Sequence, residues 1–304
     1  MNNRKHILII RPGALGDTLM LMPSIFALRP THKISVAGRR PGIEFLAPHV
    51  GQYFDMDDSV WHRLFISPAV PKGLPAKDAE LVICFMGDPD GIIHRNLKIY
   101  YPAAGIFLYP SLPLGGPKRH VAHYVAEGLK ASGIDLDPQV VLRTAMENAL
   151  LGNAEDCSRQ YLVLHPGSGS KNKNYSIYFW LELIKKINRL FKDSSSYLKV
   201  LLGPAEQEIG PQLAGKVDFN GLEIVNLPSP FDLLRLMEKT RILIGHDSGV
   251  SHVAAMTGAG TITLFKTTDP ALWHPLGPRV AVVKGIEDEE ILLARVLEHL
   301  KGLL

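Results

Sequence analysis

Short apolar runs alternate along the chain with longer stretches whose apolar positions fall at helical spacing. The runs are rich in β-branched residues, which is typical of strands buried on both faces of a parallel sheet. Strands that alternate with helices predict a parallel α/β fold. The predicted strands are residues 7–10, 33–36, 81–85, 161–164, 198–202, 223–225, 242–244, 261–265 and 280–283.

A polar loop, Asp-Ser-Gly-Val-Ser-His, follows the predicted strand at residues 242–244 and leads into a helix. Free backbone N–H groups and the positive end of the helix dipole meet at such a point, which suits a phosphate or a developing anion. An ordinary turn with Asp247 or Ser248 as the helix cap fits the same residues.

A second loop of this kind, at residues 11–17, joins the first predicted strand to a helix predicted over 18–28. Gly13 and Gly16 lack the third glycine of the dinucleotide fingerprint, and no Gly-Lys-Ser/Thr of a Walker loop follows. Asp17 either caps the helix or lies at a crevice, where it could accept a proton from a hydroxyl.

The third loop, at residues 165–175, follows the strand at 161–164. Its small residues would let backbone amides approach an anion closely, and Lys171 or Lys173 could add a positive charge. A flexible, solvated loop is the alternative. Ligands of open α/β sheets bind outside the carboxyl ends of strands, where all three loops are predicted to lie.

Four segments, residues 7–28, 165–180, 201–206 and 245–275, resemble glycosyltransferase family 9, the heptosyltransferases of lipopolysaccharide core synthesis. Order and spacing agree along nearly the whole chain, least in residues 40–115. The resemblance implies a GT-B architecture, two Rossmann-like domains facing each other across a cleft. We expect an acceptor domain at residues 1–155 and a nucleotide-sugar donor domain at 156–304. The boundary is placed in the polar stretch at residues 149–160, which precedes the predicted strand at 161–164.

The resemblance also implies roles for individual residues. Asp17 matches the family's catalytic base. Lys173 matches a lysine that faces the donor phosphates, although Lys171 is close enough to compete for that role. Glu206 would bind ribose hydroxyls or be only a first-turn helix acid. The donor-binding residues expected in this way are Gly167, Ser168, Lys173, Glu206, Asp247, Ser248, Gly249 and His252.

Three arginines are expected to hold an anionic acceptor: Arg39, Arg40 and Arg119. For all three a solvated basic segment is the alternative interpretation, at a helix start for Arg119 and after the second predicted strand for Arg39 and Arg40. Three features depart from the family pattern and leave the donor sugar open. Lys266 stands in place of a glycine, Tyr175 and Ser176 replace Trp-Pro, and the lysine-bearing loop is one residue longer than expected.

Composition narrows the class of protein. A hydrophobic content of 46% and a charged content of 21% are ordinary for a soluble globular protein. The sequence shows no cleavable signal pattern, no apolar run of ~20 residues and no metal-type cysteine spacing, so a cytoplasmic protein is expected. A net charge of +3 is too small to indicate nucleic-acid binding. It is compatible with contact with the anionic surface of the inner membrane or with a phosphorylated acceptor.

The resemblance, together with these patterns, implies an inverting glycosyltransferase that moves heptose from ADP-heptose onto a lipopolysaccharide core or another glycan. No cofactor or metal is expected, since the nucleotide sugar is a co-substrate. Two alternatives stay open: a nucleotide-sugar epimerase of the same fold, and a non-catalytic module that binds nucleotide sugars. The presence of Asp17 argues against the second.

Overall fold

The computed structural model describes residues 4–70, 72–152, 159–190, 198–203, 206, 222–226 and 228–304. The chain divides into two compact units, Met1–Thr144 and Ala145–Leu304. Residues just after the division belong to the second unit, because the N–H groups of Leu150 and Leu151 both donate to the carbonyl of Met256 at 2.8 Å. The boundary predicted at residues 155 and 156 lies outside the described residues.

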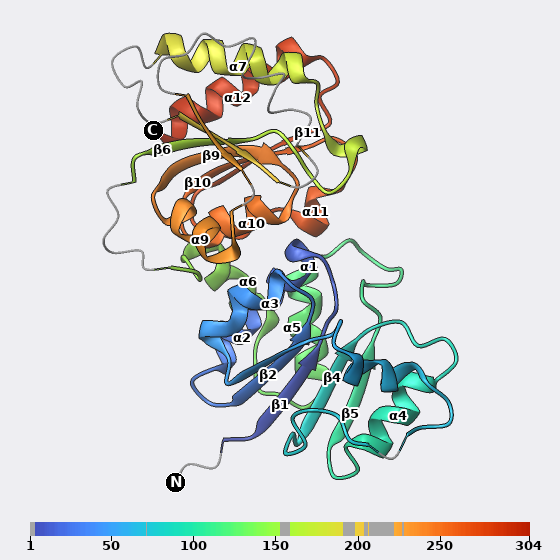
Figure 1. Cartoon of the computed structure of the whole chain (residues 1–304). Coiled ribbons are helices and arrows are strands. Elements are labelled where there is room, and N and C mark those ends of the chain that lie inside the picture. Colours follow the sequence, from blue (N-terminus) through green and yellow to red (C-terminus); the bar gives the residue numbers. More distant parts are fainter. Residues whose placement is uncertain are drawn as a thin grey trace. The chain divides into compact units, whose positions relative to one another are not determined.

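The first unit is built on one parallel sheet (Figure 1). Its strands are β1 (His6–Ile10), β2 (Lys33–Gly38), β3 (Gln52–Asp55), β4 (Leu81–Phe85) and β5 (Gly105–Tyr109). Their order in the sheet is β3-β2-β1-β4-β5, and every neighbouring pair is parallel. The order reverses at β1, so the ligand crevice of this unit is expected at the carboxyl ends of β1 and β4.

The helices of the first unit are short. They are α1 (Leu15–Leu19), α2 (Met22–Leu28), α3 (Gly42–Leu46), α4 (Ile92–Tyr100) and α5 (Val121–Ala131), with 3₁₀ turns η1 (Ala47–His49) and η2 (Ser59–Phe65). Helix α6 (Pro138–Glu147) crosses the division between the two units. The prediction of a single helix over residues 18–28 is wrong, because α1 ends at Leu19 and a separate helix, α2, begins at Met22. Pro23 explains the break, because it has no N–H to donate and is tolerated only in the first turn, where it lies in α2.

The second unit has a six-stranded parallel sheet in the order β11-β10-β9-β6-β7-β8. Its strands are β6 (Tyr161–His165), β7 (Leu198–Leu202), β8 (Leu222–Asn226), β9 (Thr240–His246), β10 (Gly260–Phe265) and β11 (Val280–Lys284). The chain moves outward from β6 to β8 and then returns to the other side of β6. The order therefore reverses between β6 and β9, and the loops after these two strands meet.

Helices cover both faces of this second sheet, as Figure 1 shows. They are η3 (Lys171–Lys173), α7 (Ile177–Leu190), α9 (Pro230–Glu238), α10 (Gly249–Met256), α11 (Pro270–Trp273) and α12 (Glu289–Leu303). One core cluster joins the apolar stripes of α7 and α12 to the sheet, through residues such as Trp180, Ile184, Val296 and Leu300. This packing fixes the strand ends from which the functional loops project.

All nine predicted strands are confirmed, and the two parallel-sheet α/β units confirm the predicted fold class. Two further strands, β3 and β5, were not predicted. Both lie at the edges of the first sheet and have exposed or half-buried residues, so they lack the buried apolar run that marks the central strands. No helix in the described part of the chain is long and apolar enough to span a membrane.

Candidate functional site

Asp247 joins three loops of the second unit at the carboxyl edge of its sheet. The carboxylate is 5% exposed, and its Oδ2 accepts hydrogen bonds from Lys173 Nζ at 2.8 Å and from Thr268 Oγ1 at 2.6 Å. Lys173 comes from the loop after β6, Asp247 follows β9, and Thr268 follows β10. The structure thus brings together Lys173 and Asp247, as the sequence predicts, whereas Lys171 is exposed.

Glu206, after β7, lies against Gly167 in the loop after β6. The Gly203 N–H donates to Glu206 Oε2 at 2.7 Å, which holds the carboxylate over the strand end. A Cβ atom on Gly167 would overlap the Glu206 carboxyl group, so only glycine lets the loop pass this close. Burial raises the pKa of Glu206, and the Gly203 N–H opposes that rise. The predicted pair therefore lies together, next to the loop that carries Lys173.

This close approach gives a direct prediction. Gly167→Ala should displace Glu206 or the loop and weaken ADP binding, since a forced contact in a packed site costs about 1–3 kcal/mol. Gly169→Ala is the matched control, because nothing lies within 4 Å of a Cβ placed there. Calorimetric titration of both variants with ADP checks the prediction, and equal affinities would show that the approach of Glu206 to Gly167 is unimportant for binding.

Ser168 fixes the turn between Gly167 and Lys173. Its hydroxyl is buried and lies 2.8 Å from the Ser170 carbonyl and 2.6 Å from Asn174 Oδ1. The Ser170 N–H in turn donates to the Ser168 hydroxyl at 3.3 Å. These bonds give the loop a defined shape, which contradicts the alternative of a loose, solvated segment.

Three histidines beneath the loops are neutral at neutral pH. Burial lowers the pKa of His246 to about 3, of His165 to about 4 and of His252 to about 4, the last against an opposing effect of Asp247. His246 Nε2 accepts the Tyr175 N–H at 2.9 Å, and the His165 ring lies 3.3 Å from the Ser248 hydroxyl. His252 is 2% exposed, and its assignment as a donor-binding residue stays a prediction.

The departures from the family pattern contact one another. Lys266 Nζ donates to the Asn174 carbonyl at 3.2 Å and lies 5.2 Å from the centre of the Tyr175 ring. The Tyr175 ring also stacks on His246, with ring centres 5.8 Å apart. A cation over an aromatic face is attracted by the ring's quadrupole. Lys266 therefore holds the loop that carries Lys173, a role that sequence alone did not reveal.

In the first unit, Asp17 lies in the first turn of α1 and is not its cap. The N-cap is Ala14, with no side-chain cap hydrogen bond, so the capping interpretation of Asp17 is wrong. Its side chain is 36% exposed. The carboxylate is thus accessible from solvent on a backbone fixed at the end of β1, which is what a base for an incoming hydroxyl requires.

Arg11, which the sequence analysis did not single out, fixes this loop. The guanidinium is 1% exposed; its Nε donates to the Asp17 carbonyl at 3.1 Å and its Nη1 to the Ser111 carbonyl at 2.8 Å. Its Nη2 lies 3.8 Å from Asp17 Oδ1. Burial lowers the pKa of Arg11, and Asp17 counteracts that change. An arginine directly after a fully apolar strand was the signal available in the sequence.

The three predicted acceptor arginines all form ion pairs with carboxylates. Arg39 Nε lies 3.1 Å from Asp57, and Arg119 Nη1 lies 2.7 Å from Glu127. Arg40 pairs with both Asp55 at 3.0 Å and Glu44 at 2.8 Å. Their charges are therefore largely offset in this structure, and their role toward an acceptor stays a prediction.

Ser248 is the N-cap of α10, as the simple capping interpretation allows, but no side-chain hydrogen bond caps the helix. Gly249 begins the helix. The first N–H groups of α10 are thus left for a ligand anion, next to Lys173 and Asp247. Within the described residues, no group of three or more His, Cys, Asp or Glu residues is arranged to hold a metal ion.

Comparison with known proteins identifies the family. The sequence model of glycosyltransferase family 9 (heptosyltransferase) matches residues 119–296, more than half of the chain. The chain belongs to glycosyltransferase family 9. This confirms the resemblance seen in the sequence.

Members and structural neighbours of family 9 agree with this placement. Lipopolysaccharide heptosyltransferase 1 of Escherichia coli is 27% identical over 169 residues, which span 55% of this chain and about half (51%) of that relative. A family 9 glycosyltransferase structure from Veillonella parvula matches with a TM-score of 0.71 at 14% identity, covering 100% of this chain and 98% of that one.

A second structure, E. coli ADP-heptose lps heptosyltransferase II, matches with a TM-score of 0.70 at 18% identity and covers 98% of each chain. At these identities the structures show the fold alone. The fold is of the GT-B class, since two parallel-sheet α/β units like these occur in the matched family 9 structures.

Proposed function

We propose that this family 9 protein is an inverting glycosyltransferase that moves heptose from ADP-heptose onto a lipopolysaccharide core acceptor. The observation that carries the proposal is the meeting of Lys173, Asp247 and Thr268 where the strand order reverses. The choice of donor is supported by two relatives from E. coli, lipopolysaccharide heptosyltransferase 1 and the structure of heptosyltransferase WaaC with ADP.

The second unit would hold the donor. The free N–H groups at the start of α10 and the Lys173 ammonium offer positive charge to the diphosphate. Glu206 can accept two hydroxyl hydrogen bonds from the ribose, and Asp247 can accept one from the sugar while it braces Lys173. Fixed donors of this kind stabilise the charge that develops on the leaving ADP.

The first unit would supply the base. Asp17 takes the proton of the acceptor hydroxyl as its oxygen attacks the anomeric carbon. The bond from that carbon to the ADP oxygen breaks, the electron pair leaves with ADP, and the configuration inverts. Arg11 acts through the loop backbone and is a positioning residue in this step. We further propose that the enzyme works at the cytoplasmic face of the inner membrane, where its net charge of +3 is compatible with an anionic surface.

Product analysis tests the proposal and separates the two alternatives. ADP-heptose is incubated with and without a heptose-free lipopolysaccharide core, and sugar and nucleotide products are resolved by mass spectrometry and NMR. Transfer predicts ADP and heptosylated core only when the acceptor is present. An epimerised donor without acceptor would indicate an epimerase, and retained ADP binding with no turnover would indicate a binding module.

A chelator tests how the leaving charge is stabilised. Under this proposal backbone N–H groups and Lys173 would bind the diphosphate, so we expect the rate of transfer to be unchanged in EDTA. The rate is measured before and after exhaustive dialysis against EDTA, with a Mg²⁺ add-back. A loss on chelation that Mg²⁺ restores would contradict the proposal that protein groups carry this charge.

A further inference from the structure

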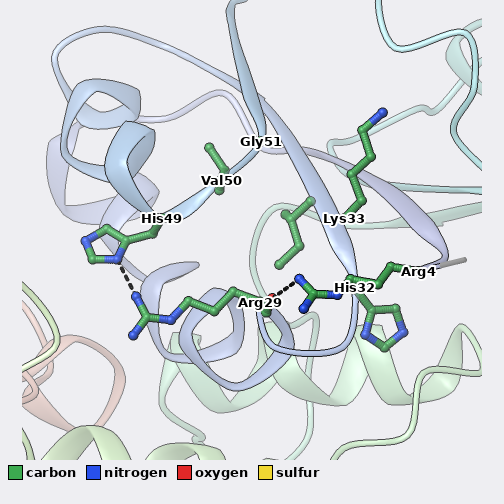
Figure 2. Close-up of a pocket in the computed structure, with 8 residues that line it drawn as sticks. Arg4, Arg29, His32, Lys33, His49, Val50 and Gly51 are labelled. Atoms are coloured by element: carbon green, nitrogen blue, oxygen red, sulfur yellow. Dashed lines mark hydrogen bonds between the residues drawn. The ribbon is translucent and has the colours of Figure 1, made fainter. Parts of the chain in front are cut away.

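A hollow in the first unit is lined by basic side chains (Figure 2). Its volume is about 360 Å³, within the range of small-molecule sites. Its lining residues are Arg4, Arg29, His32, Lys33, Ile34, His49, Val50 and Gly51, and none of them is acidic. The hollow therefore presents positive and titratable groups together with two apolar side chains, Ile34 and Val50.

This hollow lies at the end of the sheet opposite to Asp17. Arg4 precedes β1, Lys33 is the first residue of β2, and Gly51 directly precedes β3, so the lining belongs to the amino ends of the strands. A five-residue strand spans roughly 17 Å. The hollow is thus separated by the length of the sheet from the loop that carries Asp17, and it belongs to no part of the proposed catalytic machinery.

Ion pairing leaves a surplus of positive charge in the hollow. Lys33 Nζ lies 2.6 Å from Asp78 Oδ2, so that carboxylate offsets one cation. Arg29 Nη1 contacts His49 Nδ1 at 2.8 Å, and Arg4 Nη1 donates to the Arg29 carbonyl at 3.4 Å. Those partners are a neutral ring and a carbonyl, which leave the charges of Arg4 and Arg29 in place.

The His49 ring orients one of these cations. Burial and the neighbouring Arg29 both lower the pKa of His49, which keeps its ring neutral and able to accept the arginine N–H. Figure 2 shows Arg29 turned toward His49, whereas Arg4 reaches the carbonyl of Arg29. Arg29 also stacks on the Phe26 ring, with its guanidinium carbon 4.3 Å from the ring centre. The guanidinium is therefore held in place before any ligand arrives.

The end of α2 explains only part of this cluster. Cations just beyond a helix C-terminus complement the helix dipole, and Arg29 and His32 lie there. Arg4, Lys33 and His49 come from other segments and line the same hollow. Convergence from three separate segments is what a ligand site requires and what a helix end alone does not produce.

We infer that this hollow binds a phosphate-bearing ligand at a site distinct from the donor and acceptor sites. The planar guanidinium group of arginine can donate two parallel hydrogen bonds to phosphate oxygens. Arg4 and Arg29 supply two such groups from different segments of the chain. Ile34 and Val50 would contact the apolar or carbon-bearing part next to the phosphate. The same chemistry occurs in soluble phosphate esters and in lipid headgroups.

The test titrates the full chain with inorganic pyrophosphate and follows the ring signals of His32 and His49 by NMR. These signals report this hollow and not the phosphate-binding loops of the second unit. We expect both to move to saturation, and the double variant Arg4→Gln/Arg29→Gln to bind at least about tenfold more weakly, the loss expected for charge-assisted contacts. Lys98→Gln/Lys130→Gln, which removes two exposed lysines of the same unit, should bind normally.

Vesicles distinguish the two sources of phosphate. Co-sedimentation with phosphatidylcholine vesicles, with and without phosphatidylglycerol, is compared for the same variants. Anionic vesicles bound through Arg4 and Arg29 would identify a lipid headgroup, and pyrophosphate binding without vesicle binding would identify a soluble ester. Static histidine signals, or equal losses in the two double variants, would overturn the inference. Because no step depends on transfer activity, this result is independent of the proposed function.

Discussion

Asp17→Asn is expected to lower kcat by at least ~100-fold while ADP-heptose binds nearly as well as to the unchanged protein. A positioned general base contributes about 10²–10⁴-fold, and an amide cannot take the hydroxyl proton. The fold should tolerate the change. Arg11 holds the loop through the Asp17 backbone carbonyl, and Asp17 makes no capping bond.

Single-turnover kinetics and calorimetric donor titration measure the two quantities separately. Asp135→Asn is a suitable control, because Asp135 is an exposed carboxylate of the same unit to which no role is assigned. Turnover of Asp17→Asn close to normal would remove Asp17 from the role of base. A parallel loss of donor binding and of melting temperature would indicate a structural role instead.

Lys173→Ala is expected to weaken ADP binding by about 10- to 150-fold. A hydrogen bond to a charged group is worth ~1.5–3 kcal/mol, and each 1.4 kcal/mol is tenfold in affinity. Lys171→Ala should change the affinity little, because Lys171 is exposed and Lys173 is the residue bonded to Asp247. Calorimetry with ADP on both variants makes the comparison.

Loss of Lys173 also leaves Asp247 buried with fewer donors, which could destabilise the loop without any phosphate contact. The melting temperature without nucleotide separates the two effects. If Lys173 contacts the phosphate directly, the variant loses more ADP affinity than its loss of stability without nucleotide explains. Equal, small effects of the two lysine variants would place the phosphate elsewhere on the loop.

The central strands and the three loops could be predicted because each rests on a local pattern. β1 is a run of buried residues followed by glycines and an acid, and that pattern alone located Asp17. β3 and β5, which have no fully buried residue, were missed, but edge position is not the whole reason, because the edge strands β8 and β11 were predicted. Pro23 marked the break between α1 and α2, but a long apolar stretch around it suggested one helix.

Sequence could not choose between Lys171 and Lys173, because both are lysines on the same small loop. The choice depends on Asp247, which lies 74 positions further along the chain. Arg11, His246 and Lys266 were missed for the same reason. Each acts on a loop from another strand end, and only the folded sheet brings those ends together.

The position of β9 beside β6 has a consequence for how the second unit folds. The two strands form neighbouring rungs, such as Leu162 with Ile242 and Leu164 with Ile244, although two other strands separate them in the chain. Closing so long a loop is slow, because its entropy must be lost before the contacts form. A nucleotide that touches both loops would stabilise this ladder by about 2.7 kcal/mol at a hundredfold excess over Kd. Amide exchange across β6 and β9 would then slow, so binding of the donor would also stabilise the pairing of these two strands.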